Sequence, residues 1–285
     1  MGSSLAGLGV VPRGKKLYSM STMLDRYSPR LSAREMMRPD FDPLYTLIRI
    51  RVGCTLMCGR FARKRSSSVM AKDFGVQGIT EDLQPSFNIA PTQNVAVVLR
   101  DGTTRLVSMR WGLIPSWATD LTIGSKLINA RSETLTKRSA FKDAFKRRRC
   151  LVLADGFYEW QRQGKEKTPF FIHLMSERPF GFAGLYEIWT PPLSEPLITC
   201  TIVTTEPNDL VRPLHDRMPA ILPKAAENLW LDPEAEDPLR LLDLLQPYPA
   251  DDMAAYRVSS LVNSVKNDSP ECIEPAPALK QPLLF

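Results

Sequence analysis

A paired run of β-forming residues between Asn94 and Trp111 constrains the fold more than any other feature of the sequence. Two such stretches flank the dipeptide Asp101-Gly102. An Asp-Gly pair in this setting is a strong hairpin signal, because glycine readily takes the positive φ that a tight β-turn requires. The chain is therefore expected to contain an antiparallel sheet.

Further β-rich and helical stretches follow at irregular intervals. Strands are predicted over 150–154, 157–160, 170–174, 179–189 and 197–205, and helices over 132–148, 224–231 and 234–245. Leu135, Phe141, Ala144 and Phe145 would form the apolar stripe of the first helix. Neighbouring strands with irregularly interspersed helices favour antiparallel sheets over a doubly wound fold, so we predict an α+β domain.

The first 56 residues differ from the rest of the chain. They hold nine Lys/Arg and four Asp/Glu, a charge of +5, which leaves only +1 of the total +6 for residues 57–285. Three interpretations stay open: a wrongly assigned start upstream of Met57, an arginine-rich targeting segment, or a removable segment that exposes Cys58. We expect one domain over 57–278 and a short tail over 279–285. A polyanion would have to be held by a local basic patch, because this domain has little net charge.

The cysteine and histidine content disfavours a metal centre. Five cysteines are scattered without a C-x-x-C pair, and the chain has only His173 and His215. No metal and no cofactor are therefore expected. Reduced thiols and the lack of an apolar run of about 20 residues predict a cytoplasmic protein that does not enter a membrane.

Cys58 follows Met57 and precedes Gly59, which is the spelling of a protein start placed inside a chain. As a first residue it would carry an α-amine and a thiol on adjacent carbons. Such a 1,2-aminothiol condenses with an aldehyde to an imine, and the thiol then closes a five-membered thiazolidine. The alternative from the residues alone is an inert buried cysteine.

Three other residues are candidates for acid, base or hydrogen-bonding work. Glu159 is expected on a strand, on the face that Phe157 shares, where desolvation by aromatic rings would raise the pKa of a carboxylate; a solvated strand glutamate is the alternative. His215 lies in a polar loop and suits proton transfer better than His173, which we interpret as structural. Asn129 offers an amide, although an asparagine before a helix is equally a cap.

Nucleic-acid binding has weak individual signals. The basic candidates are Arg60, Arg131, Lys137, Arg138 and the run Lys146–Arg149, which also falls at a predicted helix C-terminus that favours cations. Trp111 or Trp117 could stack on splayed bases, although packing explains either one equally well.

Several motifs occur in order and together resemble one family. They are Met57-Cys-Gly-Arg-Phe, Asn88-Ile-Ala-Pro91, Trp111-Gly-Leu-Ile-Pro-Ser-Trp117, Ile128-Asn-Ala-Arg-Ser-Glu133, Ala154-Asp-Gly-Phe-Tyr-Glu-Trp160, His215-Asp-Arg-Met-Pro219 and Val262-Asn-Ser-Val-Lys-Asn267. Over about 57–275 the chain closely resembles the SRAP family of SOS-response-associated peptidases, which includes proteins that shield abasic sites. The resemblance implies a single barrel-like domain of largely antiparallel sheets with peripheral helices.

The resemblance also implies an activity. Cys58 would be the first residue of the mature protein and would cross-link to the ring-opened aldehyde of an abasic site in single-stranded DNA. Glu159 would act as general acid and base, His215 would assist sugar opening, and Asn129 would orient the amine or the sugar. The DNA contacts would come from Arg60, Pro91, Trp117, Arg131, Arg138 and Arg217; the family's usual arginine one position after Arg138 is Ser139 here. We expect a monomer that meets replication or repair proteins, associated with the nucleoid if the source is bacterial.

Two rival classes stay open. A cysteine-dependent peptidase would use Cys58 with His215 on the chain itself or on another protein, and would need no free amine. A non-enzymatic single-strand DNA-binding module would bind with strong salt dependence and leave no adduct after denaturation.

Overall fold

The computed structural model describes residues 59–191 and 195–277, so the extension, Cys58 and the C-terminal tail lie outside the described residues. The strands are β1 Phe61–Arg63, β2 Gly78–Ile79, β3 Ser86–Ile89, β4 Asn94–Asp101, β5 Thr103–Trp111, β6 Asn129–Arg131, β7 Arg149–Ala154, β8 Gly156–Gln163, β9 Glu166–Leu174, β10 Phe180–Trp189, β11 Leu197–Thr205, β12 Met218–Pro219 and β13 Met253–Arg257. The α-helices are α4 Ser67–Ala71, α5 Lys142–Arg147, α6 Lys224–Leu231 and α7 Pro238–Asp243. Short 3-10 turns include η3 Leu121–Lys126, η4 Ser132–Thr134, η6 Ser260–Asn263 and η7 Pro270–Cys272. No described helix combines the length and the apolar character that crossing a membrane would require.

Five strands close into a barrel. They follow the order β11-β10-β7-β4-β5, with antiparallel pairing throughout, and β5 then pairs with β11 in parallel through Thr199–Arg110 and Cys200–Trp111. Closure removes the free sheet edges that a strand layer would otherwise expose. β6 and β12 also pair with β11, which brings residues 129–131 and 218–219 to one side of the barrel.

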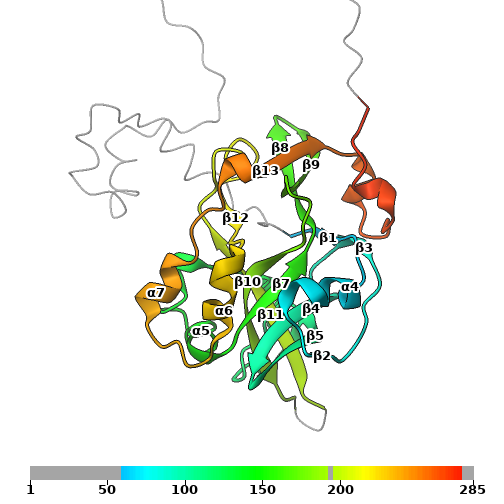
Figure 1. The fold of residues 1–285 in the computed structure, drawn as a ribbon. Coiled ribbons are helices and arrows are strands. Elements are labelled where there is room, and N and C mark those ends of the chain that lie inside the picture. The colour runs from blue at the N-terminus through cyan, green and yellow to red at the C-terminus, as the bar shows by residue number, and fades with distance from the viewer. Residues whose placement is uncertain (1–58, 192–194, 278–285) are drawn as a thin grey trace, which may run out of the picture. The chain divides into compact units, whose positions relative to one another are not determined.

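The barrel strands sort their side chains by the two-residue period of a β-strand. Val95, Val97 and Leu99 of β4 belong to the interior cluster, together with Cys150 and Val152 of β7. The intervening residues of the same strands belong to an outer cluster that includes side chains from α4, α5, α6 and α7. Figure 1 shows α5, α6 and α7 on one flank of the barrel and α4 on another.

A second sheet, ordered β13-β9-β8-β1-β3, packs on the barrel. Its inner face contributes Phe61 and Phe157 to the barrel cluster. Its outer face carries Tyr158 and Phe171, which pack against Val262 and other residues of the segment after β13. β8 therefore has one face toward the barrel and one toward this late segment, and the candidate carboxylate Glu159 lies on β8.

Most predicted elements are confirmed. The hairpin forms around Gly102, whose φ is +94°, and 197–205 and 224–231 coincide with β11 and α6. The pairing of β8 with β9 is confirmed, with Phe157 opposite Ile172. The largely antiparallel α+β architecture is therefore present, with parallel pairing confined among the described strands to β2–β5, β5–β11 and β6–β11.

Two predicted helices are wrong in extent. Residues 132–148 hold only η4 and α5, with turns between them, and 234–245 hold only α7. The four residues of the predicted stripe are nevertheless all buried. The apolar spacing correctly predicted burial, which 3-10 and irregular turns satisfy as well as a continuous helix does.

The first residue of β8 tolerates no side chain. A Cβ on Gly156 would lie 2.2 Å from Cζ of Phe171 and 2.8 Å from the carbonyl oxygen of Ile172. We expect Gly156→Ala to lower the free energy of unfolding by about 1–3 kcal/mol, because overpacking displaces the backbone of β9. Chemical denaturation measures this. Gly78→Ala is the control, since a Cβ there meets only Cγ of Arg105 at 4.0 Å; equal losses in both variants would contradict the steric explanation.

Candidate functional site

Glu159 is a buried carboxylate on the inner face of the second sheet. The Glu159 residue is 3% exposed, and by the two-residue period of β8 it shares the inner face with Phe157, as the sequence predicted. β8 holds it opposite Phe170 of β9. The alternative of a solvated strand glutamate is wrong, because the residue is buried.

Gly59, the residue that follows Cys58 in the chain, lies across from Glu159. β1 pairs with β8 through Phe61–Phe157 and Ala62–Gly156, and the amide of Tyr158 donates to the carbonyl of Arg60 at 3.0 Å. In an antiparallel register each step back along β1 matches a step forward along β8, so Gly59 is the residue opposite Glu159. Cys58, which is bonded to Gly59, lies outside the described residues.

Arg60 is held by the protein. Its Nη1 donates to Oδ1 of Asn88 at 2.6 Å and to the carbonyl of Val262 at 2.8 Å, and its guanidinium lies over the Trp160 ring at 5.9 Å. Burial lowers the pKa of the Arg60 guanidinium. These contacts fix the chain next to Gly59, and phosphate binding by Arg60 stays a prediction.

Asn129 begins β6 and does not cap a helix. It pairs with Ile202 of β11, and the 3-10 turn η4 starts three residues later, with Arg131 at its N-cap position. The helix-cap interpretation is therefore wrong. A strand position adjoining the barrel gives the Asn129 side chain a fixed direction, which suits an orienting role better than a flexible cap would.

His215 and Arg217 lie in the loop between β11 and β12. The backbone amide of His215 donates to Val211 at 2.9 Å, and Nδ1 of the ring accepts from the amide of Arg217 at 3.1 Å. The ring is mostly buried, with its side chain 12% exposed. His173 instead stacks on Phe171 and places its Nδ1 2.9 Å from the carbonyl of Leu174, which confirms its structural interpretation.

One hydrophobic cluster lies under all of these segments. It contains Phe61 two residues after Gly59, Phe157 two residues before Glu159, and Ile128 directly before Asn129. Val211 and Met218, which flank His215 and Arg217 in the chain, belong to the same cluster. Trp111 links two of the segments, because its ring contacts Phe61 at 5.3 Å and its Nε1 donates to the carbonyl of Ile128 at 2.8 Å. Segments more than 150 residues apart in sequence, from Phe61 to Met218, thus pack on one hydrophobic cluster.

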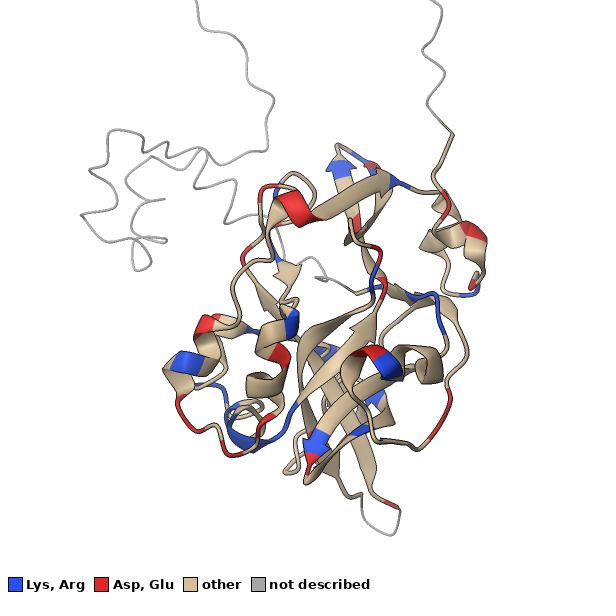
Figure 2. Ribbon diagram, in the orientation of Figure 1, with Lys and Arg blue, Asp and Glu red and all other residues tan. Residues whose placement is uncertain are grey.

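The candidate DNA-binding arginines differ in exposure and in their hydrogen-bond partners. Arg131 and Arg138 are exposed, and the guanidinium of Arg138 lies over the Phe141 ring at 5.1 Å. Arg217 is buried and donates to both carboxylate oxygens of Glu133, at 2.5 and 3.0 Å, and to the carbonyl of Thr204 at 2.6 Å. Figure 2 shows basic and acidic positions interspersed over the strands and helices, in agreement with the small net charge of this part of the chain.

The two tryptophans of the Trp111–Trp117 motif have different environments. Trp111 is fully buried, whereas Trp117 is 58% exposed. The loop that carries Trp117 is fixed to the barrel, because Nε1 of Trp189 donates to the carbonyl of Ala118 at 2.7 Å. Pro91 lies in the turn after β3, where the amide of Thr92 donates to the carbonyl of Trp111 at 2.8 Å. Packing therefore explains Trp111, and Trp117 remains the candidate for stacking on a base.

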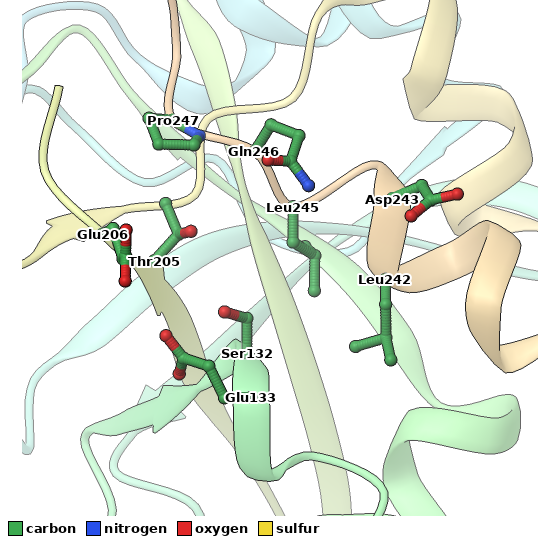
Figure 3. A pocket seen from close by; sticks show the side chains of 9 residues that line it. All are labelled: Ser132, Glu133, Thr205, Glu206, Leu242, Asp243, Leu245, Gln246 and Pro247. Atoms are coloured by element: carbon green, nitrogen blue, oxygen red, sulfur yellow. The ribbon is translucent and has the colours of Figure 1, made fainter. Parts of the chain in front are cut away.

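A hollow of about 300 Å³ lies beside Glu133. It is lined by residues from η4, from the end of β11 and from α7 and the chain after it, namely Ser132, Glu133, Thr205, Glu206, Leu242, Asp243, Leu245, Gln246 and Pro247 (Figure 3). Three of these are carboxylates, which repel a polyanion. The hollow is therefore unsuited to a phosphate backbone.

Sequence reasoning missed three residues that position the candidate site. The Asp155 carboxylate, with its side chain 1% exposed, accepts from the amide of Lys64 at 2.6 Å and from the guanidinium of Arg65, which fixes β1 against β8. Nδ2 of Asn88 donates to three carbonyls between 262 and 267. Glu133 holds Arg217. All three lie inside the motifs that carry the family resemblance, and their place in those motifs was the sequence signal that could have identified them.

No metal-binding cluster of three or more His, Cys, Asp or Glu residues occurs within 59–191 and 195–277. Cys150, Cys200 and Cys272 are free and fully buried, and burial raises the pKa of the Cys150 and Cys200 thiols. The Cys150 and Cys200 thiols are therefore poor nucleophiles.

Comparisons with known proteins agree with this architecture. The family model described as "SOS response associated peptidase (SRAP)" matches residues 57–265. "Abasic site processing protein YoqW" of Bacillus subtilis is 51% identical over 222 residues, which cover 76% of this chain and 99% of that protein. "Abasic site processing protein HMCES" of Xenopus tropicalis is 36% identical over 231 residues, covering 69% of this chain and 68% of that protein.

Solved structures show the same fold. A crystal structure of a protein from Bacteroides thetaiotaomicron superposes with a TM-score of 0.70 at 25% identity, covering 77% of this chain and 100% of that one. A protein from Bordetella bronchiseptica gives a TM-score of 0.62 at 27% identity over 71% and 100% of the two chains. By its family model, its relatives and its fold, the chain belongs to the SOS response associated peptidase (SRAP) family.

Proposed function

We propose that the protein processes abasic sites in single-stranded DNA by forming a covalent thiazolidine through Cys58. The observation that carries the proposal is the buried carboxylate of Glu159 opposite Gly59, the residue bonded to Cys58. The proposal requires the amine and thiol of Cys58 to reach this carboxylate, and it is supported by the direct bond between Cys58 and Gly59, because consecutive Cα atoms are only about 3.8 Å apart. The names of the relatives, abasic site processing proteins, support the choice of lesion.

The reaction needs only groups that the chain and the lesion supply. The α-amine of Cys58 attacks the aldehyde of the ring-opened sugar, and loss of water gives an imine. The thiol sulfur then bonds to the imine carbon, and its proton goes to the nitrogen, which closes the five-membered ring. No oxidant, reductant or metal enters this balance.

Each candidate residue has a place in this reaction. Glu159 removes and returns protons during addition of the amine and loss of water, a role that a carboxylate in a water-poor site can fill. His215 exchanges a proton with the sugar hydroxyl as the sugar ring opens. Asn129, fixed on β6 beside the same hydrophobic cluster, orients the amine or the sugar by hydrogen bonds.

The DNA strand is held by few contacts. Arg131 and Arg138 are exposed and can reach phosphates directly, whereas Arg217 would have to exchange its Glu133 partner for a phosphate. Arg60 and Pro91 lie beside the ends of β1 and β3 and complete the proposed track. A covalent bond reduces the need for electrostatic affinity, which is consistent with a nearly neutral domain; such contacts position the strand without reading its sequence.

The proposal requires a free α-amine on Cys58. In a chain that keeps residues 1–57 this nitrogen is an amide, and the thiazolidine cannot form. Self-cleavage of the Met57–Cys58 bond by Cys58 with Glu159 and His215 is the peptidase version of the same site. Intact mass spectrometry of the full chain over time checks it, and an unchanged mass counts against self-processing.

The experiment that tests the proposed function compares two preparations, the full chain and a chain that begins at Cys58. Each is incubated with single-stranded DNA that carries one abasic site, and with the same DNA without the lesion. A denaturing gel should show a covalent band for the chain that begins at Cys58, with abasic DNA alone. Absence of a band in every lane would overturn the proposal and leave the reversible binding module or the peptidase.

Trp117 provides a separate prediction on DNA binding. Because a base stacked on an aromatic ring contributes about 1–3 kcal/mol, we expect Trp117→Ala to weaken reversible single-stranded DNA binding by about that amount. The slope of affinity against salt should stay constant, since no charge is lost. Fluorescence anisotropy at several salt concentrations measures both. Arg131→Gln is the control and should reduce the slope; unaltered affinity in Trp117→Ala would show that Trp117 is no stacking platform.

A further inference from the structure

Nδ1 of His215 has one neighbour that requires it to accept a hydrogen bond and another that requires it to donate one. The backbone N–H of Arg217 lies 3.1 Å away and donates to it. The Oδ1 of Asp216 lies 3.0 Å away. An ionised carboxylate has no proton to donate, so this oxygen acts only as an acceptor. One nitrogen cannot serve both neighbours in the same protonation state.

The choice of neighbour determines what the other ring nitrogen can do. When Nδ1 accepts from Arg217, the neutral ring carries its proton on Nε2, which then has no lone pair with which to take a proton. When Nδ1 carries the proton and donates it to Asp216, Nε2 has a free lone pair and can accept a proton and return it. No hydrogen bond from Nε2 to another described residue is present, so this nitrogen is the one left for a reacting group.

We propose that Asp216 is a positioning residue that holds the proton of His215 on Nδ1, against the competing amide of Arg217. A hydrogen bond to an ionised carboxylate is stronger than one from a neutral amide, which favours Asp216. Asp216 thereby makes Nε2 a proton acceptor, and it stabilises the imidazolium that forms after transfer. The consequence for the reaction rests on the proposed function; the tautomer itself does not.

Both arginines of this loop are already paired. The Arg217 guanidinium is bound to Glu133 and the carbonyl of Thr204, and Arg212 lies 3.6 Å from Asp209. Asp216 is therefore the carboxylate with a described contact to the ring. Its side chain is 75% exposed, so replacing it leaves the packing of the loop intact.

Nitrogen NMR of the imidazole rings tests the tautomer without DNA. The chain has only two histidines, and His173, whose Nδ1 faces the carbonyl of Leu174, is an internal reference for the Nδ1–H form. In uniformly ¹⁵N-labelled full chain at alkaline pH, where histidine rings are neutral, we expect His215 to resemble His173. In Asp216→Ala the proton should move to Nε2. Identical ring shifts in the two proteins, or an Nε2–H ring in the unmodified chain, would overturn the proposal.

Adduct kinetics then separate this inference from the proposed function. In a preparation that forms the adduct, Asp216→Ala should slow formation by about two- to fivefold, the range that an exposed ion pair supports, and Asp216→Glu should restore the rate. Asp209→Ala is the matched control, because Asp209 lies in the same loop, is 93% exposed and faces Arg212. If Asp209→Ala slowed adduct formation and Asp216→Ala formed the adduct at the unmodified rate, the positioning role would be refuted while adduct formation stayed established. A chain that forms no adduct would refute the proposed function and leave the tautomer measurement intact.

Discussion

Replacing Cys58 with alanine is expected to abolish the denaturation-resistant adduct with abasic single-stranded DNA. The variant is prepared as a chain that begins at residue 58, so its first residue keeps a free α-amine that can still form an imine with the lesion aldehyde. It lacks the sulfur that closes the ring, and an imine hydrolyses when the complex is denatured. The expected result is no covalent band on a denaturing gel, together with retained salt-sensitive reversible binding.

Borohydride makes this experiment specific. Reduction of the imine converts it to a stable amine, so Cys58→Ala should give a covalent band only when borohydride is present during incubation. Cys200→Ala is the control, since the Cys200 thiol is fully buried and burial raises its pKa, and it should form the adduct as the unmodified chain does. A heat-resistant adduct of Cys58→Ala without reductant would eliminate the thiazolidine assignment.

Replacing Arg149 with alanine should lower the free energy of unfolding by about 3–5 kcal/mol, because a buried acceptor left without a donor costs about 1–3 kcal/mol. The Arg149 residue is 3% exposed. Its guanidinium donates to the carbonyls of Trp230 at 2.8 Å, Phe145 at 2.7 Å and Ala235 at 3.2 Å, and also to those of Lys146 and Asp232. These acceptors include the C-terminal ends of α5 and α6, where a cation is favoured.

Arg147→Ala is the matched control for this prediction. Arg147 belongs to the same basic run, but its side chain is 71% exposed and pairs at 3.4 Å with the equally exposed Glu236. Exposed pairs contribute about 0–1 kcal/mol, so the control should be nearly neutral. Urea denaturation compares the two variants, and similar losses would show that the buried network is not what stabilises this corner. Within the basic run 146–149, Arg149 is thus expected to stabilise the fold through its buried hydrogen bonds.

Local pattern was sufficient for most of the strands. Gly102 and the alternating residues of β4 and β5 specify their hairpin without help from the rest of the chain, because turn geometry and side-chain alternation are local properties. The face on which Glu159 lies followed from Phe157 in the same way. The chain from 135 to 141 did not follow its apolar spacing into a helix. Thr134, Thr136 and Ser139 are weak helix formers, and burial of Leu135 and Phe141 was achieved with turns.

Barrel closure could not be predicted from the sequence. The parallel pairing of β5 with β11 joins Trp111 to Cys200 across nearly ninety residues, and no local signal marks it. The pairing of β6 and β12 with β11 brings Asn129 and the end of the His215 loop to the same barrel strand. The partners of single side chains, such as Glu133 for Arg217, depend on the same long-range contacts.

The sequence by itself determined the family and the order of most strands along the chain, and it supplied the candidate residues for chemistry, since these depend on residue types and spacing. It could not show whether the carboxylate of Glu159 is buried or solvated. It also could not show whether Asn129 lies in a strand or caps a helix. It also left open whether Trp111 or Trp117 is exposed. The tertiary structure decided all of these, because burial and hydrogen-bond partners depend on which distant segments share one hydrophobic core.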